Sequence, residues 1–164
     1  MKSIRAMSAL ACTAAVLLLS GCGSKDSGDT GLRYPPTDRV ETVFQISQVP
    51  SECRVFAHLF ATMPAGMSTG EFGKRVEEEA RERGADVVLV GRSRQSVSET
   101  ALAFRYYGPA REYKAVDWSG WSFGLEDWAE QGGWVSIGYD EWRRSDVHFD
   151  YPVVMQTVFF RCRQ

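Results

Sequence analysis

The sequence predicts a small α+β domain, in which a mixed or antiparallel sheet is packed by one main helix and carries an aromatic-rich insertion. Three patterns support this fold class. Residues 68–84 have the apolar spacing of an amphipathic helix, residues 53–61, 101–107 and 153–162 alternate with the period of strands, and residues 87–90 form a continuous apolar run. We expect a single domain over residues 38–164, with residues 108–150 as the insertion.

The predicted helix has signals at both ends. Ser68 and Glu71 form an S-x-x-E capping box at its start. Gly84 is placed to end the helix in the left-handed conformation. Between these ends, apolar residues recur every four positions and give one narrow stripe. The stripe consists of Phe72, Val76 and Ala80.

The strands are predicted from the spacing of their apolar residues. The run Val87-Val88-Leu89-Val90 is typical of a central strand that is covered on both faces. Residues 40–49 give a less regular strand pattern, which Pro50 ends. In the strand over 53–61, one face is expected to carry Cys53, Val55, Ala57, Leu59 and Ala61. In the last strand, Val154, Val158, Phe160 and Cys162 are expected to face together.

Residues 1–21 have the layout of a secretory signal peptide. An apolar run follows a short positive start, and the sequence Leu19-Ser20-Gly21-Cys22 resembles the lipobox of bacterial lipoproteins. The apolar run is shorter than the roughly 20 residues that a transmembrane helix needs, and an ordinary signal peptide does not require a cysteine at this place. We therefore expect a lipoprotein that is cut before Cys22 and anchored in a membrane by acyl chains, palmitate among them, on that residue.

The residues after Cys22 indicate which membrane holds the anchor. Gly23 follows the cysteine, whereas Asp at that position is the retention signal of inner-membrane lipoproteins. The resemblance therefore implies the outer membrane, with the domain facing the periplasm, where the host has two membranes. Residues 22–37 are rich in Gly, Ser and Asp and are predicted to be a lipidated flexible tether.

The charge of the chain limits the class of partner. The sequence has 19 Lys and Arg residues and 21 Asp and Glu residues, and the predicted signal peptide contains two of the basic ones, Lys2 and Arg5. The mature chain is therefore acidic. Nucleic acid is excluded as an expected partner, because binding to phosphates requires a basic face.

Two cysteines remain once the N-terminal ones are assigned. Cys12 is removed with the signal peptide and Cys22 takes the lipid, which leaves Cys53 and Cys162. In an oxidising compartment we expect these two to form a disulfide. Two buried free thiols are the alternative, and a metal site is disfavoured because no histidines stand at ligand spacing beside them. We expect no metal and no cofactor.

One stretch of the sequence resembles a known family. Residues 72–88, with Ala80, Gly84, Ala85 and Asp86, and the later segment 101–104 are similar to small envelope lipoproteins related to the sensor of the Rcs envelope-stress system. Those proteins carry a helix ending in A…GA(D/N), an apolar strand and a late strand ending in Cys, so that Cys53 and Cys162 could match their disulfide. The second disulfide of the sensor is missing, and residues 108–150 have no counterpart there. The resemblance implies an α+β envelope lipoprotein without implying a signalling role.

The aromatic-rich segment is open to two interpretations. It contains all five tryptophans: Trp118, Trp121, Trp128, Trp134 and Trp142. Tryptophan gives a large contact area at low entropic cost, so these rings could form a surface that stacks on a glycan or binds a partner. Alternatively, the segment is a long insertion that builds its own small core, which is the interpretation we favour. A long irregular segment in a compact domain is nonetheless often functional.

Catalytic chemistry has little support in the sequence. It contains no H-E-x-x-H motif and no phosphate-binding glycine loop. His58 is expected to be a half-buried structural ring, and His148 lies in a polar loop where a weak metal site is the alternative. A glycosidase pair would need two carboxylates at a defined separation with opposed pKa values. The acids among the aromatic residues, expected to be solvated instead, are Glu126, Asp127, Glu130, Asp140 and Glu141.

These observations lead to one main functional hypothesis and two alternatives. The main hypothesis is a membrane-anchored, non-enzymatic envelope lipoprotein that binds a protein partner or monitors the envelope. The first alternative is a peptidoglycan-binding or glycan-binding lipoprotein that uses the tryptophan surface, and a hydrolase is the second. The position of the tryptophan rings separates the main hypothesis from the first alternative. A glycan-binding surface requires rings that are exposed in one plane, whereas buried rings would disfavour it.

Overall fold

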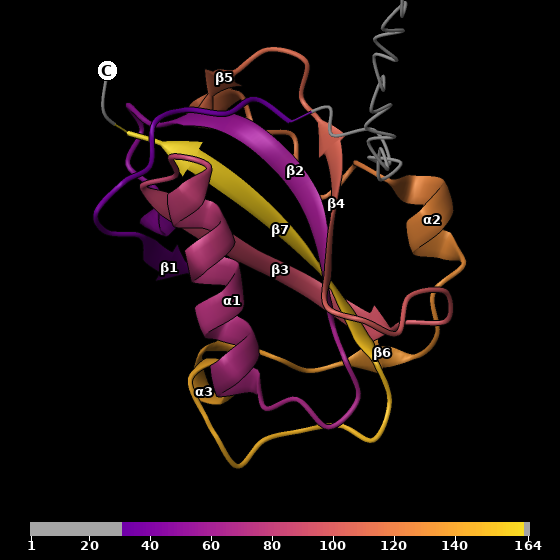
Figure 1. Ribbon diagram of the computed structural model, residues 1–164. Helices are drawn as coiled ribbons and strands as arrows, with labels where there is room; N and C mark the ends of the chain where they lie inside the picture. Colours follow the sequence, from indigo (N-terminus) through magenta and orange to yellow (C-terminus); the bar gives the residue numbers. More distant parts are fainter. Residues whose placement is uncertain (1–30, 163–164) are drawn as a thin grey trace, which may run out of the picture.

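The computed structural model describes residues 31–162, in which a twisted sheet is crossed on one face by a single long helix (Figure 1). The predicted signal peptide, the lipidation site Cys22 and most of the predicted tether lie outside these residues. Within residues 31–162, none of the helices is both long enough and apolar enough to cross a membrane. The predicted fold class, a mixed sheet packed by one main helix, is confirmed.

Seven strands form one sheet, and the last strand of the chain lies at its centre. The strands are β1 (Glu41–Val43), β2 (Arg54–Met63), β3 (Val87–Gln95), β4 (Ala103–Gly108), β5 (Tyr113–Lys114), β6 (Trp134–Val135) and β7 (Val153–Arg161). Five of them follow the order β1-β3-β7-β2-β4, while β5 pairs with β2 and β6 pairs with β3. β1 and β3 are parallel, and the other pairs are antiparallel.

The main helix, α1 (Thr69–Glu82), begins and ends where the sequence predicts. The Ser68 hydroxyl accepts a hydrogen bond from the Glu71 N–H at 3.2 Å, which caps the first turn. Gly84 has a φ of 85°, the left-handed conformation that glycine adopts without steric cost. The stripe formed by Phe72, Val76 and Ala80 is fully buried against the sheet.

Two short helices, α2 (Leu125–Ala129) and α3 (Tyr139–Trp142), lie in the predicted insertion. α3 packs closely against the first turns of α1, because two glycines of α1 leave room for it. A Cβ atom on Gly70 would lie 3.0 Å from the carbonyl oxygen of Arg144, and one on Gly73 would lie 3.0 Å from that of Trp142. The Trp142 ring then contacts Phe72 edge to face at 6.2 Å.

The sheet is covered on both faces, and β3 shows this directly. Val88 and Val90 belong to the core on the α1 face, whereas Val87 and Leu89 belong to the core on the opposite face. The prediction that residues 87–90 form a strand covered on both faces is therefore confirmed. The opposite face is covered by residues of the insertion rather than by a second long helix, since Ala115, Phe123 and Trp128 lie in its core.

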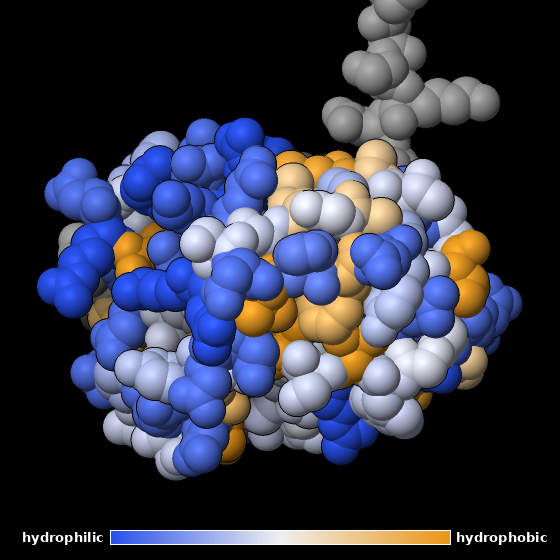
Figure 2. Space-filling model, turned by 90° about the horizontal axis from the view of Figure 1, so that it is seen from below, coloured by the Kyte–Doolittle hydropathy of each residue, from blue (hydrophilic) through white to orange (hydrophobic). Residues whose placement is uncertain are grey.

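A single helix cannot cover the whole α1 face. A helix with its side chains is about 10 Å wide, whereas five strands spaced by about 4.8 Å span roughly 20 Å. The remaining part is closed by partly buried side chains, among them Met67, Phe104 and Phe149. Figure 2 views the end of the molecule near Met67 and shows apolar residues reaching the surface in a strip beside a strongly hydrophilic region.

The predicted alternation in residues 53–61 is wrong at one point. Val55 pairs with Phe160 and Ala57 pairs with Phe159, so Phe56 is an extra residue in β2. Such a β-bulge shifts the alternation by one position. As a result, Cys53 and Val55 lie on the opposite face, whereas Ala57, Leu59 and Ala61 lie on the α1 face.

The predicted strand over 40–49 is much shorter than expected. β1 covers only Glu41–Val43, and a 3-10 helix over Ile46–Gln48 follows. The side chain of Gln48 accepts hydrogen bonds from the backbone N–H groups of Phe44 and Gln45, which turns the chain away from the sheet.

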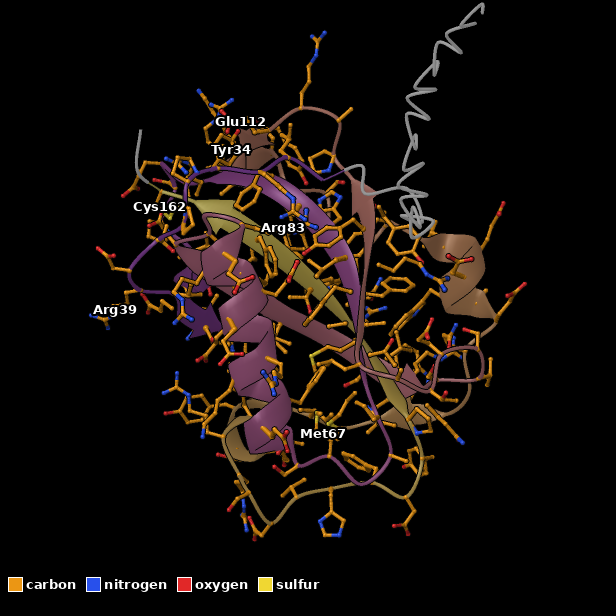
Figure 3. All side chains as sticks on the ribbon, viewed as in Figure 1. Tyr34, Arg39, Met67, Arg83, Glu112 and Cys162 are labelled. Atoms are coloured by element: carbon orange, nitrogen blue, oxygen red, sulfur yellow. A yellow bond between two sulfur atoms is a disulfide. The ribbon has the colours of Figure 1, made fainter. Side chains whose placement is uncertain are left out.

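The chain packs against the domain from Leu32 onward, which is earlier than the predicted boundary at residue 38. The Tyr34 N–H donates to the Arg83 carbonyl oxygen at 3.1 Å, and the Thr37 N–H donates to that of Arg81 at 3.1 Å. The Tyr34 hydroxyl donates to Glu112 at 2.6 Å, and Figure 3 shows these two side chains together at the upper end of the molecule. Residues 32–37 are thus part of the folded unit.

The predicted disulfide between Cys53 and Cys162 is present and joins residues 109 positions apart. It links the start of β2 to the end of β7. Closing so long a loop removes much of the conformational freedom of the unfolded chain.

Replacing both cysteines by alanine should therefore lower the free energy of unfolding by roughly 3–5 kcal/mol. Urea unfolding of the oxidised protein and of the Cys53→Ala/Cys162→Ala variant measures the difference. Equal unfolding midpoints in the two proteins would show that the bridge contributes nothing to stability.

Candidate functional site

The five tryptophans do not share one surface. Trp142 is buried on the α1 face, while the other four lie on the opposite side of the sheet. Trp128 is buried, Trp118 and Trp121 are partly buried, and only Trp134, at 66 % exposure, is largely open to solvent. The planar platform that a five-tryptophan binding surface requires is not formed. The segment does not form a separate core either, because its rings complete the core of the sheet.

The rings on the opposite face form a connected layer, here called the aromatic layer. Phe60 contacts Tyr107 at 4.5 Å, Trp128 at 5.4 Å and Phe123 at 5.9 Å between ring centroids. The layer also contains His58, Tyr113, Trp118, Trp121 and Trp134. Its fit to the sheet is close: a Cβ on Gly91 would lie 2.4 Å from the Trp121 ring.

His58 is part of this layer, as a partly buried ring. It stacks on Phe123 with centroids 4.7 Å apart and planes within 8°, and its Nε2 lies 2.9 Å from the Tyr113 hydroxyl. Burial lowers the pKa of His58 to about 4, because the charged imidazolium loses its hydration. His148 is exposed, and within residues 31–162 no cluster of three or more His, Cys, Asp or Glu side chains is placed to hold a metal ion.

Asp127 is the acid of the insertion with the most defined surroundings. It accepts hydrogen bonds from the Tyr107 hydroxyl at 2.5 Å and from Arg105 at 3.2 Å. The Tyr107 hydrogen bond, followed by that of Arg105, lowers the pKa of Asp127, and burial raises the pKa of Tyr107. A general acid needs a raised pKa, so these contacts fit Asp127 to hold neighbouring side chains rather than to donate a proton. Glu126, Glu130 and Asp140 are exposed.

A groove between β1 and α3 brings together aromatic and basic side chains from distant parts of the sequence. The cavity has a volume of about 620 Å³. This β1–α3 groove is lined by Arg39, Val40, Glu41, Thr42, Phe44, Tyr139, Asp140, Trp142, Arg143 and Arg144. Of the five predicted tryptophans, Trp142 is the one that lines it.

The aromatic residues of the β1–α3 groove support one another. The Phe44 ring lies edge to face with Tyr139 and with Trp142, each at 5.9 Å. Trp142 is 2 % exposed and forms the base, whereas Tyr139 is 81 % exposed. Tyr139 thus contacts the partly buried Phe44, which in turn packs on the buried Trp142, and an exposed ring supported in this way loses little freedom on binding a partner.

The arginines of the groove differ in how they are held. Arg143 pairs with Glu77 at 3.1 Å, and Arg144 pairs with Asp146 at 2.9 Å. Arg39 is exposed and makes no ion pair with another residue of the described chain. It is thus the basic group best placed to receive an acidic group of a ligand.

β1 also offers its backbone to the groove. It is the end strand in the order of the sheet, and the Glu41 N–H donates to the Asp86 carbonyl oxygen on the β3 side. Successive backbone groups of a strand point to opposite sides, so the N–H and C=O of Thr42 point away from β3. They face the groove that Thr42 itself lines.

No pattern in the sequence indicates this groove. It joins residues 39–44 to residues 139–144, and those two segments share neither a motif nor a common spacing. The aromatic Tyr139 close to two arginines is the local signal that could have drawn attention to it. No family model, curated protein or solved structure matches the chain.

The lowered pKa of His58 predicts a pH dependence of stability. Between pH 6.5 and about 4 the unfolded chain binds a proton at this residue that the folded chain does not bind, so the free energy of unfolding should fall as the pH falls through this interval. Thermal unfolding as a function of pH should show this slope, and an NMR titration should give His58 a midpoint near 4.

The His58→Gln variant should lose this part of the pH dependence, whereas the exposed control His148→Gln should keep it. A His58 midpoint near the ordinary value of about 6.5 would contradict the burial argument.

Proposed function

We propose that the protein is a lipid-anchored, non-enzymatic envelope lipoprotein that binds an extended segment of a partner protein in the β1–α3 groove, with an acidic group of that segment at Arg39. The observation that carries the proposal is the combination, in one groove, of a strand edge, an exposed aromatic residue on a buried aromatic base, and a set of arginines. Each of these features fits recognition of a polypeptide.

The composition of the groove favours a protein ligand. Trp, Tyr and Arg are the residues most enriched where binding energy concentrates in protein interfaces. A partner strand laid along β1 would pair with the backbone of Thr42, and its alternate side chains would reach Tyr139 and Phe44. The alternative of a glycan platform built from all five tryptophans has no such support, because their rings lie on two faces of the sheet.

Arg39 offers the groove one contact for an acidic group of the ligand. Of its lining residues, Arg39, Arg143 and Arg144 are basic, and Glu41 and Asp140 are acidic. Arg143 and Arg144 are already paired with Glu77 and Asp146, so Arg39 is the basic group of the lining that can pair with a carboxylate of the ligand. Charge-assisted hydrogen bonds from arginine to a carboxylate are roughly twice as strong as neutral ones.

The predicted anchor would keep this groove near a membrane. If Cys22 carries the lipid, Gly31 follows it nine positions later, and an extended chain of nine residue steps spans at most about 30 Å. The partner would then be a protein of the envelope, in the periplasm at the outer membrane in a host with two membranes.

A photo-crosslinking residue in place of Tyr139, in the full lipidated protein in its own cells, tests the proposal. We expect one discrete adduct with an envelope protein, most of which is lost when Arg39→Glu is added. Arg111→Glu, at an exposed arginine outside the groove, is the charge-matched control and should leave the adduct unchanged.

The proposal would be overturned if Tyr139 gave no adduct, or if the adduct persisted undiminished with Arg39→Glu. A crosslinker at the exposed Glu130 of the α2 end should not yield the same adduct, and the same adduct from both sites would indicate non-specific capture.

A further inference from the structure

We infer that a second cleft, between β4 and Gln131 just after the end of α2, binds a neutral polyhydroxylated ligand, such as the saccharide rings of a glycan. This α2–β4 cleft is separate from the β1–α3 groove and shares no lining residue with it. Its volume is about 390 Å³, which lies within the range of about 300–1,000 Å³ that is typical of small-ligand sites.

The floor of the cleft is the opposite face of the sheet, near the end of β2. Thr62 pairs with Val154 of β7 on one side and with Ala103 of β4 on the other, and Phe60 pairs with Arg105. Phe60, Thr62 and Val154 are only 3–4 % exposed, so they form a rigid, largely buried base with apolar and aromatic character. Tyr107 of β4 continues it, with its ring 4.5 Å from that of Phe60.

The walls are held in place by hydrogen bonds within the chain. The Ser96 hydroxyl donates to the Glu99 carbonyl oxygen at 2.8 Å and accepts from the Glu99 N–H at 3.1 Å, which closes the loop between β3 and β4. Gln131 joins this loop to α2: its amide nitrogen donates to the Asp127 carbonyl oxygen, and its amide oxygen accepts from the Val97 N–H. The cleft is therefore preorganised, which lowers the entropic cost of binding.

Arg105 lies between Glu99, which lines the cleft, and Asp127 of α2. Its guanidinium is 3.2 Å from Asp127 and 3.7 Å from Glu99, and its side chain is about half exposed. Because the single positive charge already faces two negative ones, an anionic ligand would meet net repulsion. A cationic ligand would have to compete with Arg105 for the same carboxylates. The cleft thus favours an uncharged ligand.

The polar groups match the hydrogen-bonding pattern of vicinal hydroxyls. A hydroxyl both donates and accepts, and Arg105 supplies donors in a fixed planar fork while Glu99 supplies acceptor oxygens. The exposed hydroxyl of Ser98 can do either. An aromatic and aliphatic floor below such groups suits the apolar C–H face of a sugar ring, which is why we assign the cleft to a saccharide.

Titration of the mature protein with neutral oligosaccharides of N-acetylglucosamine and of glucose, in a detergent without a sugar headgroup, tests the inference. We expect saturable binding of one or both, which isothermal calorimetry measures. Arg105→Ala and Glu99→Gln should each weaken the affinity by about tenfold, as expected for the loss of one charge-assisted hydrogen bond.

Two control variants show whether the saccharide binds in the cleft itself. Arg105→Lys keeps the charge but not the fork, so it should also weaken binding while leaving the unfolding midpoint unchanged. Arg92→Ala, at an exposed arginine near Trp134, should not change the affinity.

The inference would be overturned if neither saccharide showed saturable binding. It would also be overturned if Arg92→Ala abolished binding while Arg105→Ala left it unchanged. None of these outcomes bears on the β1–α3 groove, because Arg39 and Tyr139 are unchanged throughout. The two proposals can therefore fail independently.

Discussion

The burial of β7 on both faces is the constraint on which the rest of the fold depends. The strand lies in the middle of the sheet, and its residues from Val153 to Phe160 are all buried. Its alternate side chains point to opposite faces, so Val154 and Val158 need a cover on one side while Met155 and Phe159 need one on the other. Because α1 covers only one face, the rest of the chain has to supply the second cover.

The aromatic-rich insertion supplies that second cover with very little regular structure. α2 has five residues and the remainder is mostly loop, so few backbone elements are available to exclude water from the sheet. Large flat rings compensate, because each tryptophan or phenylalanine buries a large area from a single position. The absence of a side chain at Gly91 lets Trp121 lie directly against the sheet.

Both proposed sites lie where these covers end. The β1–α3 groove is at the outer edge of β1, beside the end of α3, and the α2–β4 cleft opens beside β4 and the loop between β3 and β4. A binding site at such a margin can present polar and aromatic groups on a rigid base without opening the core. The aromatic segment therefore contributes to the proposed function through its edges, namely Tyr139 and the surroundings of Asp127, rather than through the row of tryptophans as a whole.

The sequence predicts local features of this fold well and long-range ones poorly. The capping box at Ser68, the glycine stop at Gly84 and the doubly covered strand follow from neighbouring residues, and the disulfide follows from counting cysteines. The bulge at Phe56 adds one residue to a strand that is apolar nearly throughout. The spacing of apolar residues therefore does not reveal where the alternation shifts. The groove and the cleft each join segments more than 25 residues apart, which only the tertiary packing brings together.

The central claim is that the aromatic layer is a structural cover of the sheet, and paired tryptophan variants test it most directly. Trp128 is buried in the layer at 8 % exposure, and Trp134 contacts it from the solvent side at 66 % exposure. Urea unfolding should show that Trp128→Ala lowers the free energy of unfolding by about 3–5 kcal/mol, whereas Trp134→Ala lowers it by less than about 1 kcal/mol. A loss below about 1 kcal/mol for Trp128→Ala, equal to that for Trp134→Ala, would show that the insertion is not part of the core.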